Sequence, residues 1–304
     1  MRRRFAWACI TGSALLGAAA AVFAQRDFSS IEITTQKMAE GVYMLTGAGG
    51  NIGVCTGPEG VLLVDDQYAP LTEKIQAALK GISDQPVRMI VNTHWHGDHT
   101  GGNENFSKTG ALLLAHENVR QRMSTPQYIA AFDSKVDPSP ASALPVVTFQ
   151  EGITAHLNGE DLDVMHVANA HTDGDAIVWF RNANVVHLGD TFFNGMYPVI
   201  DCSSGGSIDG MIAATGMVLG KIGADTKLIP GHGPAADRAA LQGFHDMLAG
   251  VRAAVAKAAK GGKSLADVQA AKPTAPWDPV WGNGFIKPDK FVEFVYTGVT
   301  AKKK

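Results

Sequence analysis

The first half of the chain alternates short apolar runs with glycine-rich turns, a pattern typical of β-strands. One segment, residues 71–79, is different because it places Leu71, Ile75 and Leu79 on one helical face. A further apolar run leads directly into the sequence HWHGDH at residues 94–99. The pattern therefore predicts one helix, at 71–79, and strands at residues 31–35, 42–45, 52–56, 61–64 and 87–91.

The second half repeats this order of strands followed by helices. Residues 117–132 have helical character, and a proline-rich loop follows them. Two sheets with helices outside explain this order better than a doubly wound parallel sheet, in which strands and helices alternate strictly. We therefore predict an α/β (α+β) fold with later strands at 146–149, 154–157, 162–167, 177–180, 185–188 and 227–229, and later helices at 207–221 and 239–259.

The last segment of the chain has its own helical pattern. Ser264 is a suitable N-cap for a helix over 264–271, and Pro288 is suited to the start of another over 288–296. We expect one compact domain over residues 25–260, with residues 261–304 as a helical extension packed on it.

The N-terminus has the composition of a targeting segment. Arg2, Arg3 and Arg4 precede an apolar run at 14–23, and the residues 22–24 fit a small-residue cleavage site. A single-pass anchor is the alternative, but the run is shorter than the roughly 20 residues that cross a bilayer. Residues 1–24 are thus predicted to be a cleavable signal peptide of a periplasmic or secreted protein.

Charge and cysteine content limit the partners and the covalent framework. Removal of residues 1–24 takes away three arginines, so the net charge changes from −3 to −6. With no basic run before the C-terminal lysines, we expect a small-molecule substrate, no nucleic acid and no stable membrane association. The sequence leaves the oligomeric state open. It also permits a Cys55–Cys202 disulfide in an oxidising compartment without deciding whether the bond forms.

The chemistry is concentrated in HWHGDH. In an extended segment His94, His96 and Asp98 project toward one point, and His99, at the bend that follows, reaches a neighbouring point. Imidazole nitrogens and a carboxylate at this density are typical ligands of zinc. A histidine-rich surface loop is the alternative, and three histidines and one aspartate within six residues argue against it. The spacing predicts two metal sites.

The segment resembles the HxHxDH signature of the metallo-β-lactamase superfamily, and the resemblance extends over roughly residues 30–250. Further motifs follow in the family's order: AHTDGD contains His171, HLGDT contains Asp190 and PGHGP contains His232. The resemblance implies a four-layer αβ/βα sandwich. It also implies that His94, His96 and His171 hold one metal, that Asp98, His99 and His232 hold a second, and that Asp190 lies between both.

The same resemblance implies the chemistry. Two Zn²⁺ per chain, or Fe or Mn in their place, would share a hydroxide whose pKa falls from about 15.7 toward about 7. Asp98 is the predicted catalytic residue, which orients this nucleophile and relays a proton. We expect Asp65 or Asp66, after the strand at 61–64, to accept hydrogen bonds from His94 and His96. The glycine-rich residues 46–51 are a candidate flap over the site.

The remaining histidines and nearby aromatic residues fit no ligand motif. We expect Asp173 and Asp175 to cap a turn, and Trp95 and Tyr197 to belong to the core more readily than to line the pocket. The histidines that we expect to be structural or exposed are His116, His156, His166, His187 and His245.

Departures from the β-lactamase pattern bear on the substrate. β-Lactamases of the best-known subclass place Cys where Asp190 stands, lack a His after the motif's Asp, and have Lys where Phe193 stands. The ligand set therefore resembles glyoxalase II and the lactonases. Because thioesters of glutathione are cytosolic, secretion favours the opening of a cyclic amide or ester. The alternatives are a lactonase or thioesterase, a mononuclear iron sulfur dioxygenase, and a metal-storing module without enzymatic activity.

Overall fold

The computed structural model describes residues 27–301, so the predicted signal peptide at 1–24 lies outside the described residues. The chain divides into two units, Met1–Ser30 and Ile31–Lys304. In the first unit, residues 27–30 contain a turn in which Asp27 accepts a hydrogen bond from the backbone of Ser29. All the helices and strands named below belong to the second unit.

Most of the strands form two sheets. The first has seven strands, of which β1 to β4 pair antiparallel and β4, β5, β6 and β9 pair parallel. Its strands, in spatial order, are β1 Thr34–Ala39, β2 Val42–Thr46, β3 Ile52–Gly57, β4 Gly60–Val64, β5 Val87–Val91, β6 Leu112–His116 and β9 Val147–Phe149.

The second sheet is antiparallel except at its last pair, β13 and β14, which run parallel. A separate hairpin is formed by β7 Gln127–Ile129 and β8 Ser134–Val136. In spatial order the second sheet contains β10 Gly152–Leu157, β11 Glu160–His166, β12 Ala176–Phe180, β13 Val185–His187 and β14 Lys227–Ile229.

The helices connect and cover these strands. The α-helices are α1 Thr72–Lys80, α2 Gly97–Thr100, α3 Asn103–Ser107, α4 Glu117–Met123, α5 Ile208–Leu219, α6 Arg238–Ala258, α7 Leu265–Ala270, α8 Asp278–Trp281 and α9 Pro288–Thr300. Short 3-10 turns are η1 Ala69–Leu71, η2 Ala130–Phe132, η3 Ala141–Ala143, η4 Gly189–Thr191 and η5 Cys202–Ser204.

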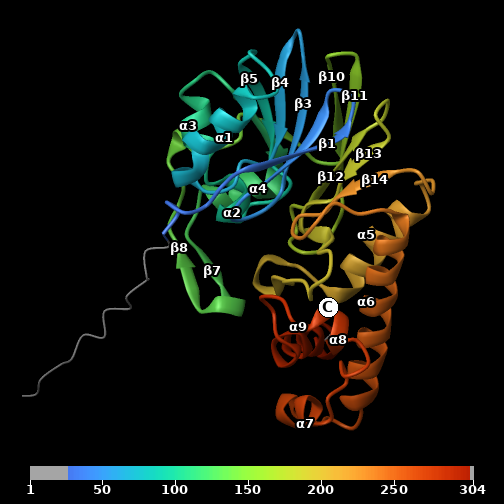
Figure 1. Ribbon diagram of the computed structural model, residues 1–304. Helices are drawn as coiled ribbons and strands as arrows, with labels where there is room; N and C mark the ends of the chain where they lie inside the picture. Colours follow the sequence, from blue (N-terminus) through green and yellow to red (C-terminus); the bar gives the residue numbers. More distant parts are fainter. Residues whose placement is uncertain (1–26, 302–304) are drawn as a thin grey trace, which may run out of the picture. The chain divides into compact units, whose positions relative to one another are not determined.

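The two sheets pack face to face. Leu62, Val64 and Val91 of the first sheet share one buried cluster with Val164 and Val178 of the second. A second cluster lies between the other face of the five-stranded sheet and the helices α5, α6 and α9, while α1, α3 and α4 lie beside the seven-stranded sheet (Figure 1). The predicted four-layer sandwich is confirmed, because each sheet buries one face on the other sheet and the other on helices.

One predicted element is wrong. Residues 117–132 were expected to be helical, but α4 ends at Met123 and the chain turns into the β7–β8 hairpin. The cause is local: Pro126 disfavours the helical conformation at Thr125 and supplies no N–H to continue the helix. At the tip of the hairpin Asp133 adopts φ 48°, a left-handed conformation that reverses the chain.

The C-terminal helices follow the sequence pattern closely. Ser264 caps α7 with a reciprocal capping box to Asp267. Helix α9 contributes Phe291 and Val295 to the cluster it shares with α5 and α6. Across the described residues, no helix has the length and apolar character needed to cross a membrane.

Candidate metal centre

The predicted ligands all follow the ends of strands at one end of the sandwich. His94 comes after β5, His171 after β11, Asp190 directly after β13 and His232 after β14. Strand ends that meet at one edge of a sandwich bring residues far apart in sequence to one place. The structure gathers all seven sequence-predicted residues there, in three overlapping groups able to hold a metal ion.

The first group, called the three-histidine group here, contains His94, His96 and His171. His96 Nδ1 and His171 Nε2 lie 2.8 Å apart. The ring centroids of His94 and His171 are 4.7 Å apart and their planes nearly perpendicular. All three side chains are buried. The group is therefore compact and closed to solvent, with nitrogens from three rings turned toward one another.

The second group, called the mixed group here, contains Asp98, His99 and His232. His232 Nε2 lies 3.3 Å from His99 Nε2 and 3.4 Å from Asp98 Oδ2. The expectation that Asp98 points the same way as His94 and His96 is wrong, because the chain is extended only as far as His96 and then enters helix α2. That helical turn moves the Asp98 side chain to the mixed group.

Asp190 joins the two groups through its two carboxylate oxygens. Oδ2 faces the three-histidine group, 3.5 Å from His171 Nε2 and 3.8 Å from His94 Nε2. Oδ1 faces the mixed group, 3.1 Å from His99 Nε2 and 3.3 Å from His232 Nε2. One carboxylate is thus shared between two clusters of ligand atoms.

Two buried atoms show that this donor set fits a metal. Among the described residues, neither His94 Nε2 nor Asp190 Oδ1 has a hydrogen-bond partner. A buried polar atom without a partner costs about 1–3 kcal/mol, so such atoms cluster where an ion or ligand supplies the missing contact. The residues present therefore fit a metal-binding His and Asp cluster.

The pKa values of the ligands follow their surroundings. Burial lowers the pKa of His94 well below its usual value and that of His171 to about 4. Burial also acts to lower the pKa of His99 and His232, but Asp190 and Asp98 outweigh it and raise the pKa of His232 to about 9 and that of His99 well above its usual value. Burial therefore favours the neutral form of His94 and His171, whereas the two carboxylates favour the protonated form of His99 and His232.

Supporting contacts fix the ligand rings. Asp65 Oδ2 lies 2.7 Å from His99 Nδ1 and also accepts a hydrogen bond from Thr93, whose hydroxyl lies 3.0 Å from His94 Nδ1. Asp201 Oδ2 lies 3.1 Å from His96 Nε2. These acceptors orient the rings and set which nitrogen remains for a metal.

The predicted acceptors for His94 and His96 are therefore corrected. Asp65 supports His99 directly and His94 only through Thr93, whereas Asp66 accepts a hydrogen bond from Gly102 N. The residue that supports His96 is Asp201, which the sequence alone did not identify. Asp201 lies 105 positions along the chain from His96, in a loop without any periodic pattern.

The third histidine is held by backbone and by a neighbouring acid. His171 Nδ1 lies 2.8 Å from the carbonyl oxygen of Val199. Asp175 accepts hydrogen bonds from the backbone N–H groups of His171 and Thr172. Asp175 thus caps the turn, as expected, and burial raises its pKa to about 7.

The loop at 46–51 packs directly against the mixed group. Gly50 N donates to the carbonyl of Asp98, and Asn51 N donates to that of Gly231. A side chain on Gly50 would overlap the ring of His99, and one on Gly231 would overlap Asp190. Glycine is therefore needed at both positions so that backbone can approach the ligands closely.

Other candidate residues take structural places. Tyr197 is buried, stacks on Phe291 and donates to Asp278, and Trp95 is buried with its ring centroid 4.7 Å from that of His96. Cys55 and Cys202, the cysteines within residues 27–301, are both free and form no disulfide.

The five remaining histidines agree with the expectation of structural or exposed residues. His116 caps α4 and stacks on His166. His156 is exposed beside Asp161, His187 is buried against the Asn51 carbonyl, and His245 lies 2.9 Å from the Thr215 hydroxyl.

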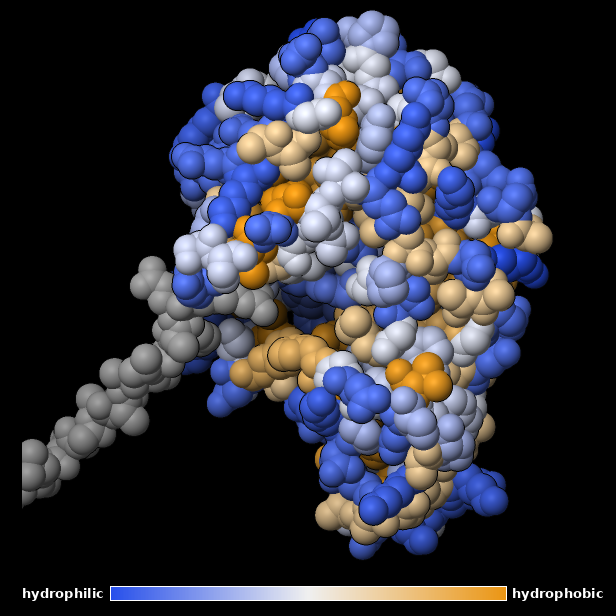
Figure 2. All heavy atoms as spheres, in the orientation of Figure 1, coloured by the Kyte–Doolittle hydropathy of each residue, from blue (hydrophilic) through white to orange (hydrophobic). Residues whose placement is uncertain are grey.

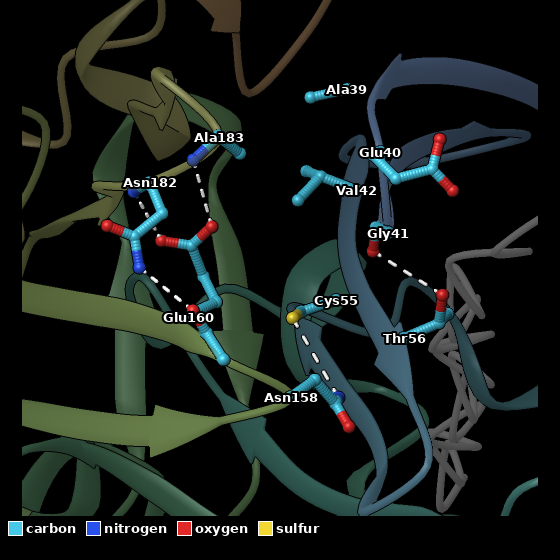
Figure 3. Close-up of a pocket in the computed structure, with 11 residues that line it drawn as sticks. Ala39, Glu40, Gly41, Val42, Cys55, Thr56, Asn158, Glu160, Asn182 and Ala183 are labelled. Atoms are coloured by element: carbon cyan, nitrogen blue, oxygen red, sulfur yellow. Dashed lines mark hydrogen bonds between the residues drawn. The ribbon is translucent and has the colours of Figure 1, made fainter.

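A cavity of about 330 Å³ lies at the other end of the same strands (Figure 3). Strands β4 and β11 begin beside it, at Gly60 and Glu160, and end near the metal centre. The buried Glu160 carboxylate accepts hydrogen bonds from the backbone N–H groups of Asn182 and Ala183. Because these donors already satisfy the Glu160 carboxylate, we interpret the cavity as part of the packing between the two sheets.

Comparison with known families agrees with this fold and site. The family model described as "Metallo-beta-lactamase superfamily" matches residues 45–256, and the chain belongs to this superfamily. The His and Asp cluster that the structure gathers fits the metal-binding motif from which this family was predicted, so the predicted family is confirmed.

Curated relatives match only in part. A hydroxyacylglutathione hydrolase from Nitrosococcus oceani is 30% identical over 149 residues, which are 48% of this chain and 48% of that protein. The alpha subunit of a 2,4-dinitroanisole O-demethylase from a Nocardioides species is 26% identical over 167 residues, 54% of this chain and 47% of that protein. The chain thus spans about half the length of the curated relatives it matches.

Solved structures share the fold. A metallo-beta-lactamase from Pontibacter korlensis superposes with a TM-score of 0.58 at 21% identity, over 72% of this chain and 99% of that one. A stereoselective inverting sec-alkylsulfatase from a Pseudomonas species gives a TM-score of 0.65 at 16% identity, over 87% of this chain and 50% of that one. At these identities the likeness establishes the architecture and leaves the substrate open.

Proposed function

We propose that the protein is a dinuclear zinc hydrolase that opens a cyclic amide or ester by attack of an activated water. The observation that carries this proposal is the placing of the Asp190 carboxylate, with one oxygen toward each ligand group. A carboxylate in this position is suited to hold two cations close together, as two-metal hydrolytic sites require.

The residues divide into two ligand sets and one shared group. His94, His96 and His171 would hold one ion, Asp98, His99 and His232 would hold the other, and Asp190 would contact both. Two divalent ions so held supply a nucleophile at neutral pH and polarise a carbonyl oxygen.

Asp98 is the residue we assign to proton handling. Its side chain is 24% exposed, whereas that of His99 beside it is fully buried. A carboxylate at the solvent side can orient an attacking water through Oδ1 or Oδ2, accept its proton and pass the proton on to the departing amine or alcohol. The low pKa of Asp98 keeps this carboxylate ionised.

The surroundings of Asp190 support this choice of substrate class. Phe193 stands where the resembled β-lactamases carry a lysine, and its ring stacks on His232 at 5.0 Å. No ammonium group is therefore offered at that position to a substrate carboxylate. An uncharged lactone, or a β-lactam held weakly, fits this site better than a β-lactam bound through its carboxylate.

The first experiment combines elemental analysis with a small hydrolysis panel: nitrocefin, a carbapenem, an acyl-homoserine lactone and a glutathione thioester. We expect about two zinc ions per chain and turnover of the lactone or the β-lactams. One iron per chain and no hydrolysis would contradict the proposal and favour a mononuclear iron sulfur dioxygenase.

A second candidate function is thioester hydrolysis. The hydroxyacylglutathione hydrolases among the relatives favour it. Turnover of the thioester in preference to the lactone by the two-zinc protein would select it. A protein that binds two metals per chain and hydrolyses no member of the panel would instead indicate a metal-storing module.

We also propose that the mature protein is periplasmic or secreted. The support is the arrangement of Arg2, Arg3 and Arg4 before the apolar run at 14–23, with a small-residue cleavage site at 22–24. Mass spectrometry of the N-terminus of the protein from the periplasmic fraction is the test, with cleavage after Ala24 as the expected outcome. An intact N-terminus retained in the membrane fraction would favour the anchor.

A further inference from the structure

Large apolar side chains are exposed together next to the metal centre. Tyr128 and Phe132 of the β7–β8 hairpin are 47% and 43% exposed, and Phe285, from the loop between α8 and α9, is 75% exposed. The rings of Phe132 and Phe285 are 5.7 Å apart although the residues are distant in sequence. We call Tyr128, Phe132 and Phe285 the aromatic rim.

The hairpin that carries Tyr128 and Phe132 packs on the metal-binding segment itself. Its inward residues Ile129 and Val136 pack on the cluster that contains Trp95, which lies between the ligands His94 and His96. At the hairpin's turn, Ala130 N donates to the hydroxyl of Ser203. The position of the hairpin is therefore fixed relative to the three-histidine group.

Two further contacts connect the region of the aromatic rim to that of the metal ligands. Ser203 hydrogen-bonds to Asp201, which supports His96. On the other side, Gly284 lies against Met196. Figure 2 shows the hairpin region as an apolar area bordering a hollow in the surface. The rim and the ligands thus belong to one continuous region.

Exposed aromatic groups beside a catalytic centre imply an apolar ligand. Contiguous apolar surface on a protein marks an interaction site. Here the hairpin that carries two of the rings is linked to the ligand His96 through Ser203 and Asp201, and the ligand His232 is itself stacked on Phe193. The nearby guanidinium of Arg122 is held at 2.6–2.7 Å by both oxygens of Asp173, so it is already paired. The chemistry of the region suits an uncharged, apolar group.

We propose that the aromatic rim binds an apolar alkyl substituent of the substrate and so makes the enzyme selective for lactones or esters with a long uncharged chain. This inference rests on the proposed hydrolase function. Each methylene buried on such a surface contributes about 0.8 kcal/mol, or roughly fourfold in binding. Longer chains should therefore raise kcat/KM mainly by lowering KM.

The test compares γ-lactones that carry no substituent, a butyl group or a heptyl group. The wild-type zinc enzyme should show kcat/KM rising with chain length by about twofold to fourfold per methylene until the surface is filled. Phe285→Ser and Phe132→Ser should flatten this rise and leave the turnover of the unsubstituted lactone unchanged. Val146→Ser is the control, since Val146 is 66% exposed, directly precedes β9 and is not part of the aromatic rim.

A binding measurement separates this inference from the proposed function. The neutral probe N-phenyl-1-naphthylamine, followed by its fluorescence, should bind the zinc-loaded wild type and lose about five- to tenfold in affinity in Phe285→Ser, with no loss in Val146→Ser. If no substrate is hydrolysed but this pattern of probe binding holds, the proposed function fails and the apolar site stands.

Two outcomes would overturn the inference alone. The first is lactone hydrolysis that does not depend on chain length, with equal probe binding by wild type and Phe285→Ser. The second is a wild-type dimer that Phe285→Ser converts to a monomer, as measured by sedimentation, with an unchanged chain-length profile. That result would assign the rim to contact between copies of the chain.

Discussion

The two ligand groups of the metal centre differ in how they are held. In the three-histidine group every side chain is buried, and each ring contacts a fixed acceptor: Thr93, Asp201 or the Val199 carbonyl. In the mixed group, Asp98 and His232 keep 24% and 22% of their side chains exposed. One half of the centre is thus closed and the other opens to solvent.

The difference assigns different roles to the two halves. A closed set of histidine rings, each held by a fixed acceptor, is preorganised for a cation and binds it with little rearrangement. In the mixed group Asp190 and Asp98 raise the pKa of His99 and His232, so that a metal there competes with protons. We therefore expect the tighter ion in the three-histidine group and the more readily exchanged ion in the mixed group.

The largest effect is expected where the two groups meet. Asp190→Ala removes the carboxylate that lies against four histidine rings of both groups, and should abolish stoichiometric metal binding. Hydrolysis should fall by about a thousandfold or more, the order found when a principal charge-stabilising group is deleted. Elemental analysis and initial rates check this, with the exposed Asp246→Ala as control. Two metals retained by Asp190→Ala would contradict the shared-carboxylate arrangement.

A direct contrast between the groups comes next. His232→Ala should leave about one metal per chain, held by the three-histidine group, whereas His96→Ala should release the tighter ion and abolish hydrolysis while most of the fold remains. Metal stoichiometry after dialysis, together with circular dichroism, distinguishes the two variants. An active, metal-replete His96→Ala protein would remove His96 from the ligand set, and equal loss in both variants would show that the halves do not differ.

The supporting acids allow a finer comparison. Asp201→Asn should weaken the tighter site about ten- to a hundredfold, and Asp65→Asn should do the same to the exchangeable site, because each change removes the charged acceptor of one ligand ring. Titration with a competing chelator measures both affinities. If each variant weakened both sites equally, the supporting contacts would act through the fold as a whole and not through one ring.

The smallest effect is expected from Phe193, whose ring stacks on that of His232. Phe193→Leu removes a stacking contact worth about 0.5–1.5 kcal/mol, so the exchangeable metal should bind about two- to tenfold more weakly. The neighbouring Phe192→Leu is the matched control, since Phe192 packs on Phe244 in the helical core. That control should lower the melting temperature and leave metal affinity intact. The reverse result would assign Phe193 a purely structural role.

Much of the fold could be predicted because the strands appear in the sequence as short apolar runs. Strand β5 and strand β14 match the predicted ranges residue for residue, since Pro86 directly precedes β5 and Pro230 directly follows β14. The β7–β8 hairpin was missed because its residues continue a helical pattern beyond Met123, and a single proline decides the outcome.

The metal centre, like the fold, could be predicted from the sequence only in part. The sequence identified all the residues that the structure gathers, because ligand chemistry demands particular side chains within short motifs. It missed the placing of Asp98, which depends on the four-residue helix α2, and it missed Asp201, which depends on the approach of a distant loop. A residue that supports a ligand from a distant loop stands at no fixed spacing from that ligand, so the sequence alone does not reveal it.

The position of Trp95 has an optical consequence. Its indole lies 4.7 Å from the ring of His96, inside the cluster on which the hairpin is built. A paramagnetic ion such as Cu²⁺ or Co²⁺ bound by the neighbouring histidines would quench the emission of this tryptophan, whereas Zn²⁺ would not quench it in this way. The chain therefore contains its own fluorescent reporter, with which the filling of the buried half of the centre can be followed in real time without any added dye.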